Sequence, residues 1–161
     1  MSKTWALLER FDVPDFDRPE VNYLTRLRIV ATPWFGIYLH RIGTPDSRPV
    51  LHDHPWSFLS LVLWGSYTEV TPVLEGLPPI GRKRRRVRWA NWKPARSFHY
   101  IAELHTRAVW TLVFTGPRKR TWGYWDAEHG GWVEFDKHPV LAPEFDRAMA
   151  ERQRLRGGGA S

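Results

Sequence analysis

Short runs of strand-forming residues, separated by glycine and proline, dominate the middle of the chain. Apolar and polar side chains alternate roughly over residues 23–30 and 35–42, which favours half-buried strands. A longer apolar run, 58–70, contains Gly65, and a glycine inside a strand pattern predicts a bend or a bulge. Further strands are expected at residues 82–89, 98–101, 109–115, 121–125 and 132–135. This pattern of short strands and Gly/Pro turns predicts an all-β sandwich or barrel.

The two ends of the chain depart from this pattern. Residues 5–10 are typical of one or two helical turns, which Pro14 would end. Residues 143–156 have the composition of a helix, and the glycine-rich residues that follow are typical of a loose tail. We therefore expect three parts: an N-terminal extension over 1–20, a β-barrel over 21–138, and a C-terminal helix with a flexible tail over 139–161.

Composition narrows the class of protein further. Apolar residues make up 42% of the chain and aromatic residues 14%, which is too apolar for a disordered protein. The absence of cysteine excludes disulfides, cysteine zinc sites and cysteine nucleophiles, so any metal must be held by His, Asp or Glu. The sequence has no signal-peptide pattern and no run of 18 apolar residues, so we expect a cytoplasmic protein with no membrane span.

The segment around His52 and His54 carries the clearest chemical signal. Two histidines at positions i and i+2 of an extended backbone project from the same face, so both can bind one metal ion. An isolated pair of this kind is equally often a surface feature of a loop. His99 follows 45 residues later, after one hairpin, and an antiparallel barrel can return it to the first pair. Three neutral imidazoles leave positions open on a metal, which is typical of a reactive site.

These histidines fit the first motif of the cupin family, G-x5-HxH-x3,4-E-x6-G, which the chain resembles. His52, His54 and Gly65 match this motif. Phe58 stands where the family has its glutamate, and Asp46 stands near the place of its first glycine.

The second cupin motif, G-x5-PxG-x2-H-x3-N, is matched in part. Pro94 and His99 fit with the expected spacing, while Arg96 replaces the second glycine and Glu103 replaces the asparagine. The chain also resembles small single-domain cupin proteins of bacteria and phages, through residues 52–58, 65–69 and 110–117.

The resemblance implies a small antiparallel jelly-roll barrel that holds one divalent metal ion on His52, His54 and His99. Without the family's glutamate, the site resembles the neutral three-His iron site of thiol dioxygenases. Fe(II) is therefore the first expectation, and Mn, Ni and Zn also suit imidazole ligands. Glu69 or Glu103 remains a candidate for an additional oxygen ligand. The resemblance implies a dioxygenase-like enzyme acting on a small anionic substrate, and a homodimer, because cupin barrels often pair through edge strands.

Positive charge is concentrated in one part of the chain. The net charge is +7, and residues 81–120 carry 12 of the 24 Lys and Arg with a single acid. The run 82–88 is interpreted either as a solvated edge strand or, with Trp89 and Trp92, as a strip that binds phosphate or single-stranded nucleic acid. The second reading makes the protein a non-catalytic binding module for a phosphorylated or nucleotide-like ligand or for nucleic acid.

Two arginines are candidates to orient an anionic substrate in the catalytic reading. Arg96 lies three residues from His99, and Arg120 shares a predicted strand face with aromatic residues. Packing at the rim of the barrel is the alternative role for both. Among the other histidines, His40 could line the barrel, while His129 and His138 flank turns and are expected at the surface.

Overall fold

Strands dominate the computed structural model, which describes residues 6–73, 81–128 and 131–157. Six strands form one antiparallel sheet in the order β1-β2-β3-β9-β4-β7. Their bounds are Ala6–Pro14 for β1, Asn22–Ala31 for β2, Gly36–Ile42 for β3, Val109–Thr115 for β9, Phe58–Trp64 for β4 and Ala90–Lys93 for β7. The long steps in sequence between neighbouring strands, such as β3 to β9, are those of a jelly roll and not of a simple meander.

The remaining strands form a second sheet and a short ribbon, both antiparallel. The second sheet has the order β6-β5-β8, with bounds Gly81–Val87, Tyr67–Val73 and Tyr100–Leu104, and the ribbon pairs β10 (Gly123–Asp126) with β11 (Gly131–Glu134). A short 3-10 helix, η1 (Phe135–Lys137), leads from the ribbon to helix α1 (Leu141–Gly157). Most of the glycine-rich tail expected after the helix lies outside the described residues.

The two sheets face each other across an apolar core. One cluster joins Ile42 and Val109 of the six-stranded sheet to Tyr67, Val87 and Ile101 of the three-stranded sheet. Full burial of each such side chain contributes about 1.5–3 kcal/mol. The predicted all-β jelly roll is therefore confirmed, and its core lies between the sheets.

Gly65 marks the point where the chain passes from one sheet to the other. The single long strand expected over 58–70 is two strands, because β4 joins the six-stranded sheet and β5 joins the three-stranded sheet. Gly65 has a φ of +82°, a conformation that other residues rarely adopt. A Cβ atom here would lie 2.9 Å from the carbonyl oxygen of Ala108 and would also collide with Oγ1 of Thr106.

The N-terminal segment is a strand, so the expected helical turn over 5–10 is wrong. β1 pairs along most of its length with β2, and its backbone hydrogen bonds outweigh the local preference for helix. Arg28 of β2 holds the two strands together by an ion pair with Glu9 at 2.8 Å and by stacking over the ring of Phe11.

Strand β7 was not expected, because its pattern of polarity is inverted. Asn91 and Lys93 are buried, while Trp92 between them is 61% exposed. A pattern with polar residues inside gives no strand signal by hydrophobicity. The buried amide and ammonium groups contact the candidate site described below.

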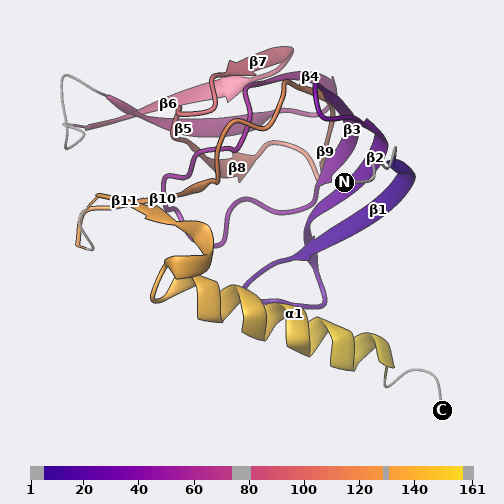
Figure 1. The fold of residues 1–161 in the computed structure, drawn as a ribbon, viewed down its shortest axis with the longest axis vertical. Coiled ribbons are helices and arrows are strands. Elements are labelled where there is room, and N and C mark those ends of the chain that lie inside the picture. Colours follow the sequence, from indigo (N-terminus) through magenta and orange to yellow (C-terminus); the bar gives the residue numbers. More distant parts are fainter. Residues whose placement is uncertain (1–5, 74–80, 129–130, 158–161) are drawn as a thin grey trace.

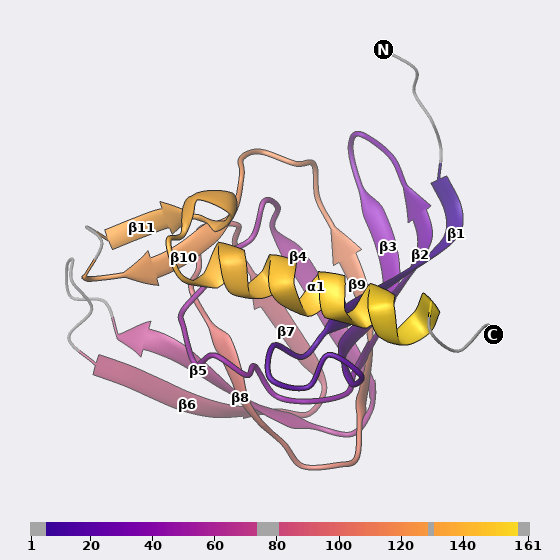
Figure 2. The same ribbon diagram turned by 90° about the horizontal axis from the view of Figure 1, so that it is seen from below.

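Helix α1 confirms the expected C-terminal helix. Figure 1 shows it at the opposite end of the molecule from β6 and β7, and Figure 2 shows it running from the β10–β11 ribbon toward β1. His138, expected at the surface, is buried, and its Nδ1 accepts hydrogen bonds from the backbone of Val140 and Leu141 at the start of the helix. Within the described residues, no helix is long and apolar enough to cross a membrane.

Candidate metal centre

His52 and His54 lie on an extended segment between β3 and β4 that is paired on both of its edges. His52 exchanges two backbone hydrogen bonds with His99, each 3.0 Å long, and it also forms a bridge with Tyr124 of β10. The segment is thus held as a short strand although it belongs to neither sheet. This pairing places His99, just before β8, directly opposite His52.

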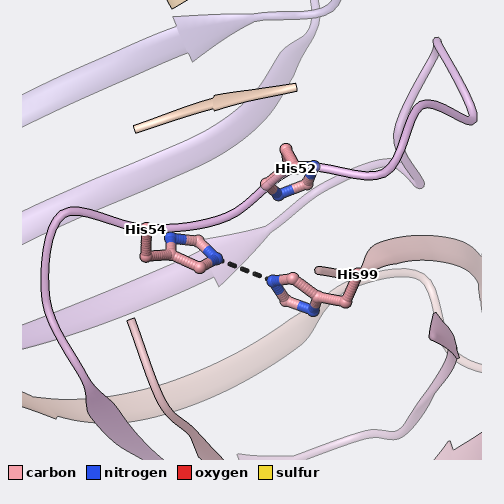
Figure 3. A group of neighbouring side chains, drawn as sticks. All are labelled: His52, His54 and His99. Atoms are coloured by element: carbon pink, nitrogen blue, oxygen red, sulfur yellow. Dashed lines mark hydrogen bonds between the residues drawn. The ribbon is translucent and has the colours of Figure 1, made fainter. Parts of the chain in front are cut away.

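The three imidazole rings gather at one point (Figure 3). The ring centroids of His52 and His54 each lie 5.0 Å from that of His99 and 5.4 Å from one another. The Nε2 atoms of His54 and His99 are 2.7 Å apart, and the potential ligand atoms of all three residues lie within 4.8 Å of one another. A divalent ion with metal–nitrogen bonds of about 2.0–2.1 Å separates neighbouring ligand nitrogens by about 3 Å, so these rings can share one ion after small adjustments.

Hydrogen bonds on the far sides of two rings leave the inner nitrogens available. Nδ1 of His99 lies 2.6 Å from Oε1 of Glu69, and Nδ1 of His52 lies 3.4 Å from the carbonyl oxygen of Val50. With each Nδ1–H donating outward, Nε2 of each ring carries a lone pair, and in the metal-free chain that of His99 accepts a hydrogen bond from Nε2–H of His54. An outer acceptor that fixes the ring in this way is the usual support of a metal-binding histidine.

Burial keeps two of these rings neutral at ordinary pH. It lowers the pKa of His52 to about 4 and lowers the pKa of His54 well below its usual value, with a further contribution from the neighbouring rings. Metals bind the unprotonated imidazole, so no proton has to be displaced from these two ligands near neutral pH. The chemistry of the donor set therefore fits a divalent metal ion.

Glu69, a candidate for an oxygen ligand, instead supports His99 from behind. Its carboxylate is fully buried, and it contacts Nζ of Lys93 at 2.9 Å, Nδ2 of Asn91 at 2.8 Å and the guanidinium of Arg85 at 3.1 Å. Burial alone would raise the pKa of the Glu69 carboxyl, but the hydrogen bond from His99 and the charge of Lys93 lower it overall. An ionised carboxylate with both oxygens engaged orients a ligand and does not replace one.

Glu103, the other acidic candidate, lies away from the histidines. It is exposed on β8, 3.7 Å from Arg84. Asp53 also points away from the ring cluster, because side chains alternate along the extended segment that carries His52 and His54. Its buried carboxylate accepts hydrogen bonds from the backbone N–H of Gly123 at 2.8 Å and from Nε1 of Trp132 at 3.1 Å, which tie the histidine segment to β10 and β11.

Neither arginine expected to orient a substrate reaches the histidine cluster. Arg96 is exposed, because it sits on a turn outside the barrel. Arg120 is bound to Asp53 at 2.5 Å and stacks over the ring of Trp132 at 4.7 Å. Both therefore lie outside the cavity, and Arg120 stabilises the histidine segment through its ion pair with Asp53.

The three histidines open into a cavity of about 100 Å³ between the sheets. Its walls include the rings of Tyr38, Trp56 and Phe58, with Phe58 packed edge-on against His54 at 4.8 Å. Phe58 thus fills the place where the family motif has its glutamate. The volume accommodates several water molecules or a small organic molecule, and it is well below the roughly 300–1,000 Å³ of sites for drug-sized ligands.

Two polar residues of the cavity come from β2 and β3. His40 lines the cavity, as expected, and Arg26 lies opposite it in the register of the two strands. Nothing in the sequence distinguishes Arg26 from the many other arginines, because only the sheet register shows which of them faces inward. His105 bonds to Thr68 at 2.8 Å and lies outside the cavity lining, and His129 is outside the described residues.

The basic run 82–88 forms the exposed edge strand β6. Several of its arginines have partners within the chain, since Arg85 binds Glu69, Arg86 binds Ser66 at 2.9 Å and Arg84 faces Glu103. These contacts agree with the interpretation of a cationic edge that discourages pairing with another sheet.

Comparison with known proteins gives structural likeness only. No protein-family model matches the sequence, and no curated relative matches it. An RmlC-like cupin from Shewanella frigidimarina is 14% identical, with 74% of this chain and 97% of that chain aligned at a TM-score of 0.49. Hydroxypropylphosphonic acid epoxidase from S. wedmorenis is 14% identical, with 67% and 55% aligned at a TM-score of 0.45. A mutant of Bacillus subtilis oxalate decarboxylase is 11% identical, with 65% and 28% aligned at 0.47.

The chain thus spans about half of the epoxidase and less than a third of the decarboxylase. Identities this low concern the fold and not the reaction. The two facing sheets form a jelly roll, and its His-x-His segment is paired to a third histidine, as the resemblance of the sequence to cupins implies.

Proposed function

We propose that this chain is a metal-dependent cupin enzyme that binds one divalent ion through His52, His54 and His99. The observation that carries the proposal is the convergence of three imidazoles, with ligand atoms within 4.8 Å of one another. The outward hydrogen bond of His99 to Glu69 supports it, because that bond leaves Nε2 free to bind a metal.

Fe(II) is the ion we favour, with Mn, Ni and Zn as alternatives that imidazole also binds. When bound, the ion supplies Lewis acidity or activates oxygen. Three neutral protein ligands leave several of its positions open and leave its charge uncompensated, which favours a small anionic substrate. The dioxygenase-like reaction and the homodimer are proposals that rest on the family resemblance, and the cytoplasmic location is a proposal as well.

The residues of the chain have separable tasks in this proposal. The histidines bind the ion, and Glu69 holds the ring of His99 in one orientation. Tyr38 and Trp56, stacked with ring centroids 6.3 Å apart, line the cavity and limit the water that enters with a substrate. These two rings shape the space that a substrate would fill.

Elemental analysis of the purified protein tests the metal centre. After anaerobic reconstitution with Fe(II), Mn(II), Ni(II) or Zn(II) and desalting, the wild-type chain should retain about one ion per chain of at least one metal. His99→Ala should retain less than a tenth of that amount. His105→Ala is the matched control, because His105 lies outside the cavity lining, and it should bind metal like the wild type.

Two results would count against the proposal: a wild-type chain that retains no ion, or a His99→Ala variant that retains it fully. If either result is found, and both the wild type and His99→Ala bind oligonucleotides in a salt-sensitive manner, the protein would be a binding module that uses the basic strand β6.

A further inference from the structure

Arg26 is a positive charge that faces the cavity. It lies on β2 opposite His40 of β3, and both residues line the cavity together with the three candidate ligands. Nε of Arg26 donates a hydrogen bond to Nε2 of His40 at 3.0 Å, and the guanidinium lies 5.4 Å from the centre of the Tyr38 ring. The guanidinium is thereby held in one orientation between a ring and a strand neighbour.

The charge of Arg26 has no counter-ion among the residues that the structure describes. Its one hydrogen bond there is to a neutral acceptor, and no carboxylate lies within ion-pair distance of it. Neighbouring Arg28, in contrast, is paired with Glu9. A guanidinium stays charged, and a partly buried one without a counter-ion is costly unless an anion or water lies beside it.

His40 orients the guanidinium group of Arg26. Burial, and then the charge of Arg26, lowers the pKa of His40 well below its usual value, so the ring is a neutral acceptor. Because His40 occupies only Nε of Arg26, the two terminal nitrogens of the guanidinium have no protein partner in the described part of the chain. Two parallel N–H groups on one edge match the two oxygens of a carboxylate.

We propose that Arg26 is the anion-binding residue of this cavity and takes the carboxylate of a small organic acid. The cavity of about 100 Å³ limits the acid to a few non-hydrogen atoms. The inference deepens the proposed function, since the other end of the same acid would meet the ion held by the histidines. Arg26 thus takes the role that the sequence suggested for Arg96 or Arg120.

Glycolate, acetate and inorganic phosphate are the probes for this site, with binding followed by calorimetry on the reconstituted and on the chelator-treated protein. The metal content of every sample is measured in parallel. We expect glycolate to bind the wild-type chain and to bind Arg26→Met at least tenfold more weakly, with metal content unchanged. Arg26→Lys should keep part of the affinity, and Arg96→Met is the matched control that should keep all of it.

Thermal stability separates a binding role of Arg26 from a structural one. Removing an uncompensated charge should leave the melting temperature of Arg26→Met equal to or above that of the wild type in anion-free buffer, and glycolate should raise only the wild-type value. If Arg26→Met melts lower and Arg26→Lys restores the stability without glycolate binding, Arg26 is structural and the inference is overturned.

The remaining outcomes distinguish this inference from the metal proposal. Glycolate binding that depends on Arg26 in a chain that retains no metal would support the anion site and refute the metal centre. Glycolate binding that is unchanged in Arg26→Met, in a chain that retains metal, would refute the anion site alone. Tight phosphate binding without glycolate binding would overturn the assignment to a carboxylate.

Discussion

Oε1 of Glu69 lies 2.6 Å from Nδ1 of His99, and neither side chain is appreciably exposed to solvent. The negative charge that the cupin motif places on the metal is absent at Phe58, yet a carboxylate stands behind one of the three ligands. The negative charge of Glu69 is therefore separated from the candidate ion by one hydrogen bond and the imidazole ring of His99. This arrangement makes Nε2 of His99 a stronger electron-pair donor to the ion, and the coordination positions that the protein does not fill remain available.

Replacing Glu69 with glutamine should weaken metal binding by about 10- to 100-fold, because an amide is a weaker acceptor and carries no charge. Competition with a chromophoric chelator measures the affinity, and the 15N shifts of the His99 ring report its tautomer. Glu103→Gln, on an exposed residue, is the control and should behave as the wild type.

Lys93 is buried beside Glu69, so Glu69→Gln also leaves the ammonium group of Lys93 without its counter-charge. The double variant Glu69→Gln/Lys93→Met removes both charges and should recover folding if the single variant is unstable. Unchanged affinity in a folded variant would show that Glu69 has no part in the metal centre.

Acid should destabilise the metal-free protein through its buried histidines. The pKa of His52 is lowered to about 4 in the folded state and that of His54 is lowered as well, against about 6.5 when unfolded. The unfolded chain then binds more protons below pH 6.5, so the free energy of unfolding should fall from pH 6.5 to about pH 4. Urea denaturation at several pH values measures this slope, and His52→Gln/His54→Gln should flatten it. An equal slope in both proteins would assign the acid sensitivity to other groups.

Substitution of Gly65 by alanine should lower the free energy of unfolding by about 1–3 kcal/mol, since φ is positive and the space for Cβ is occupied. Gly81→Ala provides a comparison on an edge strand, because no atom lies within 4 Å of a Cβ there. That variant should differ from the wild type by less than about 0.5 kcal/mol. Chemical denaturation of both variants measures the free energy of unfolding. Similar losses in Gly65→Ala and Gly81→Ala would show that the conformation at Gly65 has no special importance for stability.

The ion pair of Asp53 and Arg120 should stabilise the histidine segment as a coupled unit. Asp53→Asn and Arg120→Met should each cost about 1–3 kcal/mol, because the first removes the counter-charge of a partly buried guanidinium and the second leaves a fully buried carboxylate without its cation. The double variant should cost less than the sum of the two, which a double-mutant cycle on the free energy of unfolding detects. Additive losses would mean that the two side chains act separately. Asp136→Asn, on an exposed residue, is the control.

The strands and the histidine cluster could be predicted because their signals are local. The alternating runs 23–30 and 35–42 nearly coincide with β2 and β3. In β3 the buried Gly36, Tyr38 and Ile42 have partly buried neighbours, whereas every residue of β2 is partly buried. The parity of His52 and His54, together with the spacing to His99, predicts that these three residues meet, and they do.

The remaining features depend on pairing between distant strands. β1 forms because β2 offers it a partner, and the helical tendency of its own residues gives no sign of this. Glu69 meets His99 through the register of β5 with β8, and Arg26 meets His40 through that of β2 with β3. A single sequence reveals neither register, so sequence analysis selects Arg96 and Arg120 and does not find Arg26.

His52 is bridged by its backbone both to His99 and to Tyr124, so an ion on the three rings would lock together chain segments that are otherwise joined by a few main-chain hydrogen bonds. A ligand present at 100 times its dissociation constant stabilises a folded chain by about 2.7 kcal/mol. The rise in melting temperature can therefore rank candidate ions by their affinity for this protein, and this measurement needs no substrate.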